Sequence, residues 1–159
     1  MKIYIASDHA GFELKKTLIE HLKSKDVDVE DCGAKTLDPS DDFPDFIIPC
    51  ALRVTQGKLH GTFGIVIGGS GQGEAIAANK VKGIMAAVYY GGPSTSSGLD
   101  IVGLSKEHND ANVLSLGARF LTVNEAKEAI DLWLEAKLNP NLKYKRRIDK
   151  IKKYEEQNH

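Results

Sequence analysis

The sequence predicts an α/β fold built around a parallel sheet. Short β-rich runs recur between helical patterns, and each run ends in a turn of small residues. This alternation is typical of βαβ units, in which helices join parallel strands. The expected strands cover residues 2–7, 27–32, 63–69, 83–90 and 112–117.

Helical patterns fill the intervals between these runs. Residues 12–25 place their apolar side chains on one helical face. A second helix is expected near residues 45–56, where Pro49 should interrupt it. A third follows Thr122, a plausible N-cap with Glu125 at capping-box spacing. Residues 91–100 form the most loop-like stretch of the chain.

Length and composition predict one domain covering residues 1–159. Hydrophobic residues make up 42% and charged residues 27%, which is ordinary for a globular protein and suggests neither disorder nor a membrane span. The net charge of -1 points to no particular partner, and no aromatic platform or zinc spacing supports nucleic-acid binding. The first residues lack the apolar core of a signal peptide, so we expect a cytoplasmic protein. Cys32 and Cys50 are too few for a disulfide framework and lack metal-ligand spacing.

The C-terminal stretch 143–156 is strongly basic. Such runs usually form the solvated face of a helix. Here Tyr144, Ile148 and Ile151 share one face, which predicts a helix docked on the fold or on a second subunit. Lys143 and Arg147 lie four residues apart, so both can contact one anion.

Three polar motifs follow expected strands or precede the last one. In an open parallel sheet, ligands gather beyond the carboxyl ends of the strands. Asp8 and His9 follow the first strand, although Asp8 also suits a simple helix N-cap. His108 and Asn109 precede the last strand, where polar clusters often mark only a turn. The imidazole of His108 is a group that can relay a proton.

The central motif is the glycine-rich stretch 68–80. It lacks the lysine of a Walker loop and the third glycine of a dinucleotide-binding loop, which disfavours polyphosphates and dinucleotides. What remains is a nest of backbone N–H donors beside Glu74. A carboxylate beside such donors suits proton abstraction next to a carbonyl, with the amides stabilising the enediolate. The alternative is that Glu74 only complements the positive end of its helix.

Five segments of the chain form a distinctive set: SDHAG, DDFPDF, GIVIGGSGQGEAIAANKV, KEHNDANVLSLGAR and KRRIDKIKKYE. Together they resemble the type B ribose-5-phosphate isomerase family over nearly the whole chain. The resemblance implies a Rossmann-like three-layer α/β/α sandwich with a five-stranded parallel sheet and an extended C-terminal helix. It also implies aldose–ketose isomerisation without metal or other cofactor, in a homodimer whose sites are shared between subunits. Whether dimers pair into tetramers stays open.

The resemblance assigns roles to individual residues. Glu74 stands where one branch of the family carries its base, and Gly68 stands where the other branch carries a cysteine base. His108 matches the histidine that opens the sugar ring, and Asn109 matches its substrate-binding neighbour. The amides that stabilise the enediolate correspond to Gly69, Ser70, Gly71 and Gly73.

Other residues match binding positions. Asp8 corresponds to a residue that holds sugar hydroxyls, and His9 to one near the phosphate. Arg147 matches a phosphate-binding arginine contributed by the partner subunit, and Lys143 stands where a second arginine is common. Arg119 is a further candidate for the phosphate.

Several departures leave the substrate open. Phe43 replaces a frequent tyrosine beside the sugar, and Met85 replaces a frequent arginine. The stretch from Gly91 to Leu104 is longer than usual and lies close to His108. The leading hypothesis is interconversion of ribose 5-phosphate and ribulose 5-phosphate. The alternatives are an isomerase of galactose 6-phosphate, allose 6-phosphate or a tetrose phosphate, or a nucleotide- or ligand-binding module without catalysis.

Overall fold

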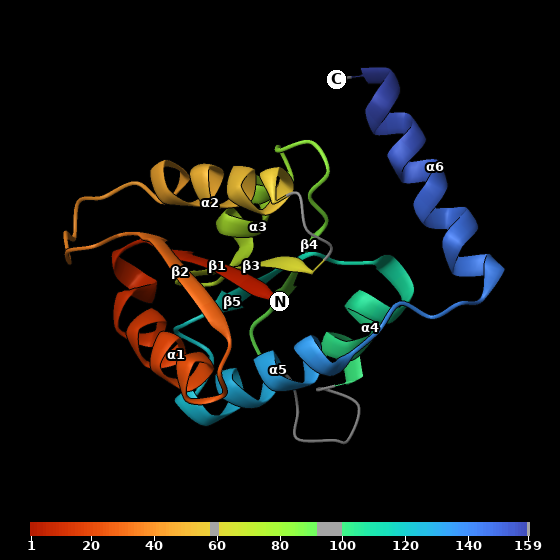
Figure 1. Ribbon diagram of the computed structural model, residues 1–159. Helices are drawn as coiled ribbons and strands as arrows, with labels where there is room; N and C mark the ends of the chain where they lie inside the picture. Colours follow the sequence, from red (N-terminus) through yellow and green to blue (C-terminus); the bar gives the residue numbers. More distant parts are fainter. Residues whose placement is uncertain (58–60, 92–99, 159) are drawn as a thin grey trace.

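All five expected strands form, and they make one sheet (Figure 1). The computed structural model describes residues 1–57, 61–91 and 100–158. The strands are β1 (Lys2–Ser7), β2 (Asp28–Gly33), β3 (Thr62–Gly68), β4 (Ala86–Tyr89) and β5 (Val113–Gly117). They pair in parallel in the order β2-β1-β3-β5-β4. This confirms the predicted five-stranded parallel sheet.

The largest error in a strand boundary concerns β4, which begins three residues later than the hydrophobic run predicts. Gly83 has a positive φ of 84°, so the chain turns there. Two asparagine side chains then bind the backbone before the strand starts: Asn112 Oδ1 accepts from Met85 N at 2.8 Å. Asn79 Oδ1 accepts from Ala86 N at 2.7 Å. These bonds hold Met85 and Ala86 in place at the point where β4 begins.

The helices occupy most of the predicted intervals. They are η1, a short 3-10 helix (His9–Gly11), α1 (Phe12–Ser24), α2 (Pro44–Gln56), α3 (Gln72–Ala78), α4 (Asp100–Asn109), α5 (Val123–Glu135) and α6 (Leu142–Asn158). The capping box of Thr122 and Glu125 at the start of α5 is confirmed. Among the helices of the described residues, none is both long and apolar enough to cross a membrane.

Two helical predictions need correction. The expected interruption at Pro49 is wrong, because α2 continues through it. The side chain of Pro49 is exposed, and its ring removes only the one backbone hydrogen bond that would reach back four residues. The predicted loop 91–100 lies mainly outside the described residues, but its last residue, Asp100, begins α4, a helix that the sequence did not predict.

The sheet separates two apolar cores, as the predicted three-layer sandwich requires. Helices α1, α4 and α5 cover one face, and α2 and α3 cover the other (Figure 1). Along β1, Ile3 and Ile5 enter the first core, whereas Tyr4 and Ala6 enter the second. This alternation follows from the pleat of a strand, which directs successive side chains to opposite faces.

A buried lysine joins α4 to the first core. Lys106 is 7% exposed, and its ammonium lies 3.7 Å from the ring centre of Phe63 and 4.5 Å from that of Trp133. It also donates to the backbone carbonyl of Trp133 at 3.2 Å. Burial lowers the pKa of Lys106 to about 8. The two ring faces favour the charged form and offset part of this burial effect.

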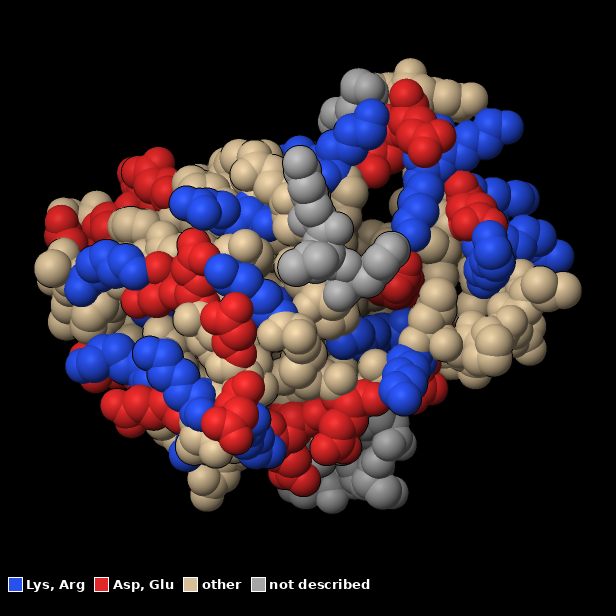
Figure 2. All heavy atoms as spheres, viewed as in Figure 1, with Lys and Arg blue, Asp and Glu red and all other residues tan. Residues whose placement is uncertain are grey.

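The C-terminal helix α6 extends from the body of the molecule (Figure 1). Ile148 is its one fully buried side chain among the described residues, whereas Ile151 of the same predicted face is 56% exposed. Lys152 binds Asp110 at 3.1 Å, and Tyr144 stacks on His108. Figure 2 shows lysine and arginine side chains gathered along α6, with acidic side chains among them. The extended helix is confirmed, but its apolar side is largely uncovered.

Candidate active site

A cavity of about 390 Å³ opens at the carboxyl ends of the three central strands β1, β3 and β5. Its lining residues follow these strands or begin helices α2 and α3. They are Asp8, His9, Ala10, Phe43, Gly69, Ser70, Gly73, Glu74, Arg119 and Phe120. The cavity therefore lies where the sheet topology predicts a ligand site.

The glycine loop between β3 and α3 is held against the turn that follows β5. Gly71 adopts a left-handed conformation with φ of 76°, which favours glycine, and caps α3. Ser115 donates its hydroxyl to the Gly71 carbonyl at 2.6 Å. The backbone N–H of Arg119 donates to the Gly69 carbonyl at 3.0 Å. These bonds position the loop rigidly and place Arg119 beside it.

Glu74 reaches from the first turn of α3 into the cavity, although only 4% of the residue is exposed. Burial raises its pKa, its own backbone N–H opposes this shift, and the nearby charge of Asp8 raises the pKa further. The carboxylate lies against Gly68, where a side chain would collide with it. A buried carboxylate with a raised pKa is a stronger base than an exposed one.

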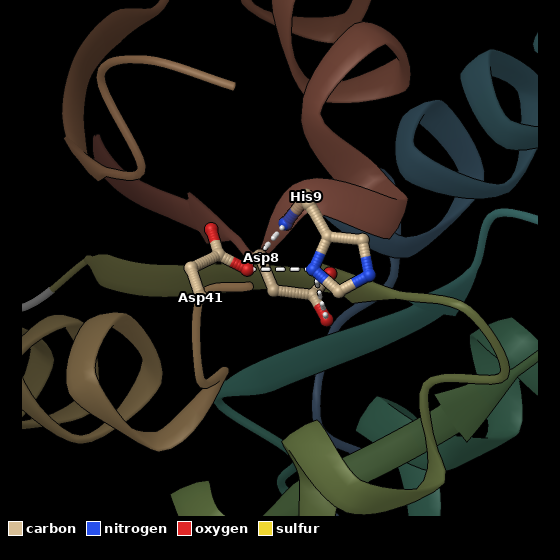
Figure 3. A group of neighbouring side chains, drawn as sticks. All are labelled: Asp8, His9 and Asp41. Carbon is tan, nitrogen blue, oxygen red and sulfur yellow. Dashed lines mark hydrogen bonds and ion pairs between the residues drawn. The ribbon is translucent and has the colours of Figure 1, made fainter. Parts of the chain in front are cut away.

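Asp8, His9 and Asp41 form a cluster beside the cavity, in which Asp41 is hydrogen-bonded to His9 and Asp8 lies 3.9 Å from the His9 ring (Figure 3). Asp8 Oδ1 accepts from the backbone N–H of Ala10 at 2.9 Å and caps η1. His9 contacts one oxygen of Asp41 twice, through its backbone N–H at 3.0 Å and through Nδ1 at 2.6 Å. The hydrogen bond that the Asp41 carboxylate accepts from the His9 ring is the main reason that the pKa of His9 is raised.

The same three side chains could be considered as metal ligands, because one ligand atom of each lies within 4.8 Å of the others. However, His9 Nδ1 and Asp41 Oδ1 are only 2.6 Å apart, which is a short hydrogen-bond distance. Two ligands of one tetrahedral zinc ion lie about 3 Å apart or more. The geometry therefore favours a shared proton at this position over a shared metal ion.

Comparison with known proteins places the chain in a family. The model of the ribose/galactose isomerase family matches residues 3–151. The chain belongs to this family. It is 40% identical to ribose-5-phosphate isomerase B of Mycobacterium tuberculosis over 155 residues, which cover 98% of this chain and 90% of the relative. The predicted resemblance is thus confirmed.

Two solved structures of family members are similar over nearly the whole chain. One is ribose-5-phosphate isomerase B of Mycoplasma genitalium with bound ribulose 5-phosphate, with a TM-score of 0.89, 41% identity, and coverage of 98% of this chain and 96% of that chain. The other is the Clostridium thermocellum enzyme, with a TM-score of 0.89, 38% identity and full coverage of both chains. The family fold therefore extends through α6.

The structure brings together most of the residues that the sequence nominates. Eight of them line the cavity: Asp8, His9, Phe43, Gly69, Ser70, Gly73, Glu74 and Arg119. Gly71 shapes the loop from behind this surface. Four others are not among the cavity's described lining residues: His108, Asn109, Lys143 and Arg147. His108 and Asn109 lie in the last turn of α4, and the other two are exposed on α6.

Three residues near the ligand site were not predicted from the sequence. Ala10 and Phe120 line the cavity, and Asp41 binds His9. The acidic pair at 41–42, directly before Phe43, was the available signal, but acids before a helix usually serve as caps or solvated turns. The free thiols of Cys32 and Cys50 are not among the described residues of the cavity lining.

Proposed function

We propose that this protein interconverts ribose 5-phosphate and ribulose 5-phosphate, with Glu74 as the base. The observation that carries the proposal is a buried carboxylate beside a glycine loop, in a chain similar throughout its length to a relative with bound ribulose 5-phosphate. Glu74 lines the cavity. An acid that only interacts with the positive end of its helix does so equally well at an exposed position, so that role does not explain the burial of Glu74.

The reaction needs one proton to move between neighbouring carbons. Glu74 removes the proton from C2 of the open-chain aldose, and the electron pair passes to the carbonyl oxygen to give an enediolate. A proton passes from O2 to O1, and Glu74 returns its proton to C1, which gives the ketose. Backbone N–H groups of the loop from Gly69 to Gly73 would stabilise the negative charge of the intermediate.

We also propose that the working unit is a cytoplasmic homodimer with shared sites. His108 and Asn109 at the end of α4, together with Lys143 and Arg147 on α6, are outside the described cavity lining of their own chain. A second copy can supply them, as the resemblance implies for Arg147. The exposed apolar residues of α6 suit such an interface: Leu142 is 78%, Ile151 56% and Tyr154 70% exposed.

The test of the base replaces Glu74 with glutamine in the purified protein. Glu74→Gln should retain the fold and bind ribose 5-phosphate, but kcat should fall by about 100-fold or more. Glu13→Gln is the matched control, because Glu13 also lies in the first turn of a helix but is exposed. Activity near that of the parent protein in Glu74→Gln would reject the assignment.

A different sugar phosphate is the second candidate, and Phe43 favours considering it. Its ring lies against Gly73 in the cavity, where the family often has a tyrosine hydroxyl. Comparing kcat/KM for pentose, hexose and tetrose phosphates decides between the substrates. A higher value for a non-pentose would replace ribose 5-phosphate while leaving the chemistry unchanged.

A further inference from the structure

The side chain of Asp41 is committed to His9 although the two residues lie 32 positions apart. Oδ1 of Asp41 accepts from both the backbone N–H and the ring Nδ1 of His9. Figure 3 shows the other ring nitrogen on the side of the imidazole away from Asp41. One carboxylate oxygen thus fixes both the backbone and the ring of a residue that lines the cavity.

We propose that Asp41 is a positioning residue that holds the proton of His9 on Nδ1 and orients the ring so that Nε2 can donate to the phosphate of the substrate. The phosphate contact rests on the proposed function, whereas the orientation of the ring does not. Carboxylate partners fix histidine tautomers in this way in many sites, because the hydrogen bond of one nitrogen determines what the other presents.

The environment of Asp41 favours a protonated His9. The Asp41 side chain is 8% exposed, and its Oδ2 is buried without a hydrogen-bond partner. Within the described ranges, His9 is its one ion-pair partner. A buried carboxylate without a cation is costly. A protonated His9 neutralises it, so Asp41 favours the imidazolium.

The other charges around His9 do not reverse the increase in its pKa that Asp41 causes. Asp8, at the end of β1, lies 3.9 Å from Nδ1 and also raises the pKa of His9, whereas Arg119, from the turn after β5, lowers it. Asp38 approaches from the loop that carries Asp41, and Glu74 lies across the same cavity. With His9 protonated, His9 and Arg119 contribute two cations to the lining of the cavity, which suits a dianionic phosphate.

The orientation is tested by nitrogen-15 NMR of the free protein with EDTA present. At a pH above the pKa of His9, where the ring is neutral, the parent should show the remaining ring proton on Nδ1. Asp41→Asn keeps an acceptor oxygen without the charge, so it should keep this tautomer and lower the pKa of His9. Asp41→Ala should lose the tautomer preference as well. Asp42→Asn is the control, since it removes the adjacent exposed carboxylate and should change neither property.

Binding is tested with inorganic phosphate as well as with ribose 5-phosphate. The comparison is made at a pH between the pKa of His9 in Asp41→Asn and that in the parent, where His9 is mostly protonated only in the parent. There, Asp41→Asn should bind inorganic phosphate more weakly. Its KM for ribose 5-phosphate should be about 10-fold higher, with kcat almost unchanged. In the parent, KM should rise as pH increases through the pKa of His9, and in Asp41→Asn this rise should occur at lower pH.

The outcomes separate this inference from the proposed function. If ribose 5-phosphate is not converted, the proposed function fails, but the NMR and phosphate titrations still decide the role of Asp41. An Nε2–H tautomer in the parent, or an unchanged His9 pKa in Asp41→Asn, overturns the inference. Stoichiometric binding of Zn²⁺ to Nδ1 also overturns it, because the metal would replace the proton. Asp41→Asn has nearly the same shape as the parent, so it decides the matter if Asp41→Ala does not fold.

Discussion

The carboxylate of Glu74 occupies the space that a side chain at Gly68 would need. A Cβ placed on Gly68 would lie 1.9 Å from Oε1 of Glu74, a distance that no two such atoms can keep. The resemblance places a cysteine base at position 68 in the other branch of the family. The two positions therefore compete for one volume at the end of β3, so a side chain at position 68 would require Glu74 to move.

Gly68→Ala should displace Glu74 and reduce both stability and activity. Overpacking of a buried site costs about 1–3 kcal/mol. The double variant Gly68→Ala/Glu74→Ala should recover most of the lost stability but not the activity, because the second change vacates the space. Urea unfolding of the four proteins in this cycle measures the coupling. Additive effects would show that the two residues do not compete.

Stability should depend on pH through Glu74. Because burial raises its pKa in the folded protein, the native state holds this proton more tightly than the unfolded chain. The resulting stability is present below the ordinary glutamate value of 4.5 and is lost as pH rises through the raised pKa. Glu74→Gln should therefore melt near the parent temperature at low pH and several degrees higher at neutral pH. Thermal unfolding across this range, with Glu13→Gln as control, measures the difference; a constant offset would contradict it.

Lys106 should make the stability of the fold increase with pH, at a higher pH range than that of Glu74. Its pKa is about 8 in the fold and 10.5 ordinarily, so the unfolded chain binds the proton more tightly between these values. The parent should gain stability as pH rises through this window. Relative to the parent, Lys106→Met should thus become less stable between about pH 7 and about pH 10. Lys23→Met, at an exposed site on α1, should show no such trend in urea unfolding.

Shared sites can be tested by mixing inactive variants. Glu74→Gln alters the cavity, whereas Arg147→Ala alters α6 and leaves the cavity residues in place. If Arg147 serves the partner's site, each mixed dimer has one site with both changes and one with neither. Refolding equal amounts together should restore about a quarter of the parental activity. Activity that stays at the level of the separate variants would mean that both residues serve the same chain's site.

The strands and most helices were predictable because their signals are local. β1 is a short continuous apolar run, α1 and α5 carry apolar residues at helical spacing, and Thr122 and Glu125 match the capping-box pattern at the start of α5. α4 was missed for a physical reason. It is anchored by Val102, which is 1% exposed, and by Lys106, a cation buried between two aromatic rings. A pattern of apolar residues does not reveal a core position occupied by lysine.

Part of the candidate site was predictable for a similar reason. Parallel strands bring Asp8, the glycine loop and Glu74 to one edge of the sheet. The expected topology was therefore enough to predict that these residues lie at a ligand site. Asp41 was missed because its partner is 32 residues away and its loop has no periodic pattern. The placement of His108 outside the described cavity lining could not be predicted. The order of residues along one chain does not show whether a side chain lines the cavity of its own chain or that of a second subunit.

The position of Trp133 makes the molecule its own optical probe. It is the one tryptophan of the sequence, has no exposed surface, and packs edge-on against Phe63 in the core under α1, α4 and α5. Its emission therefore senses only this side of the sheet. Comparing fluorescence with far-ultraviolet circular dichroism during unfolding will show whether the two layers on either side of the sheet melt as one unit or in succession.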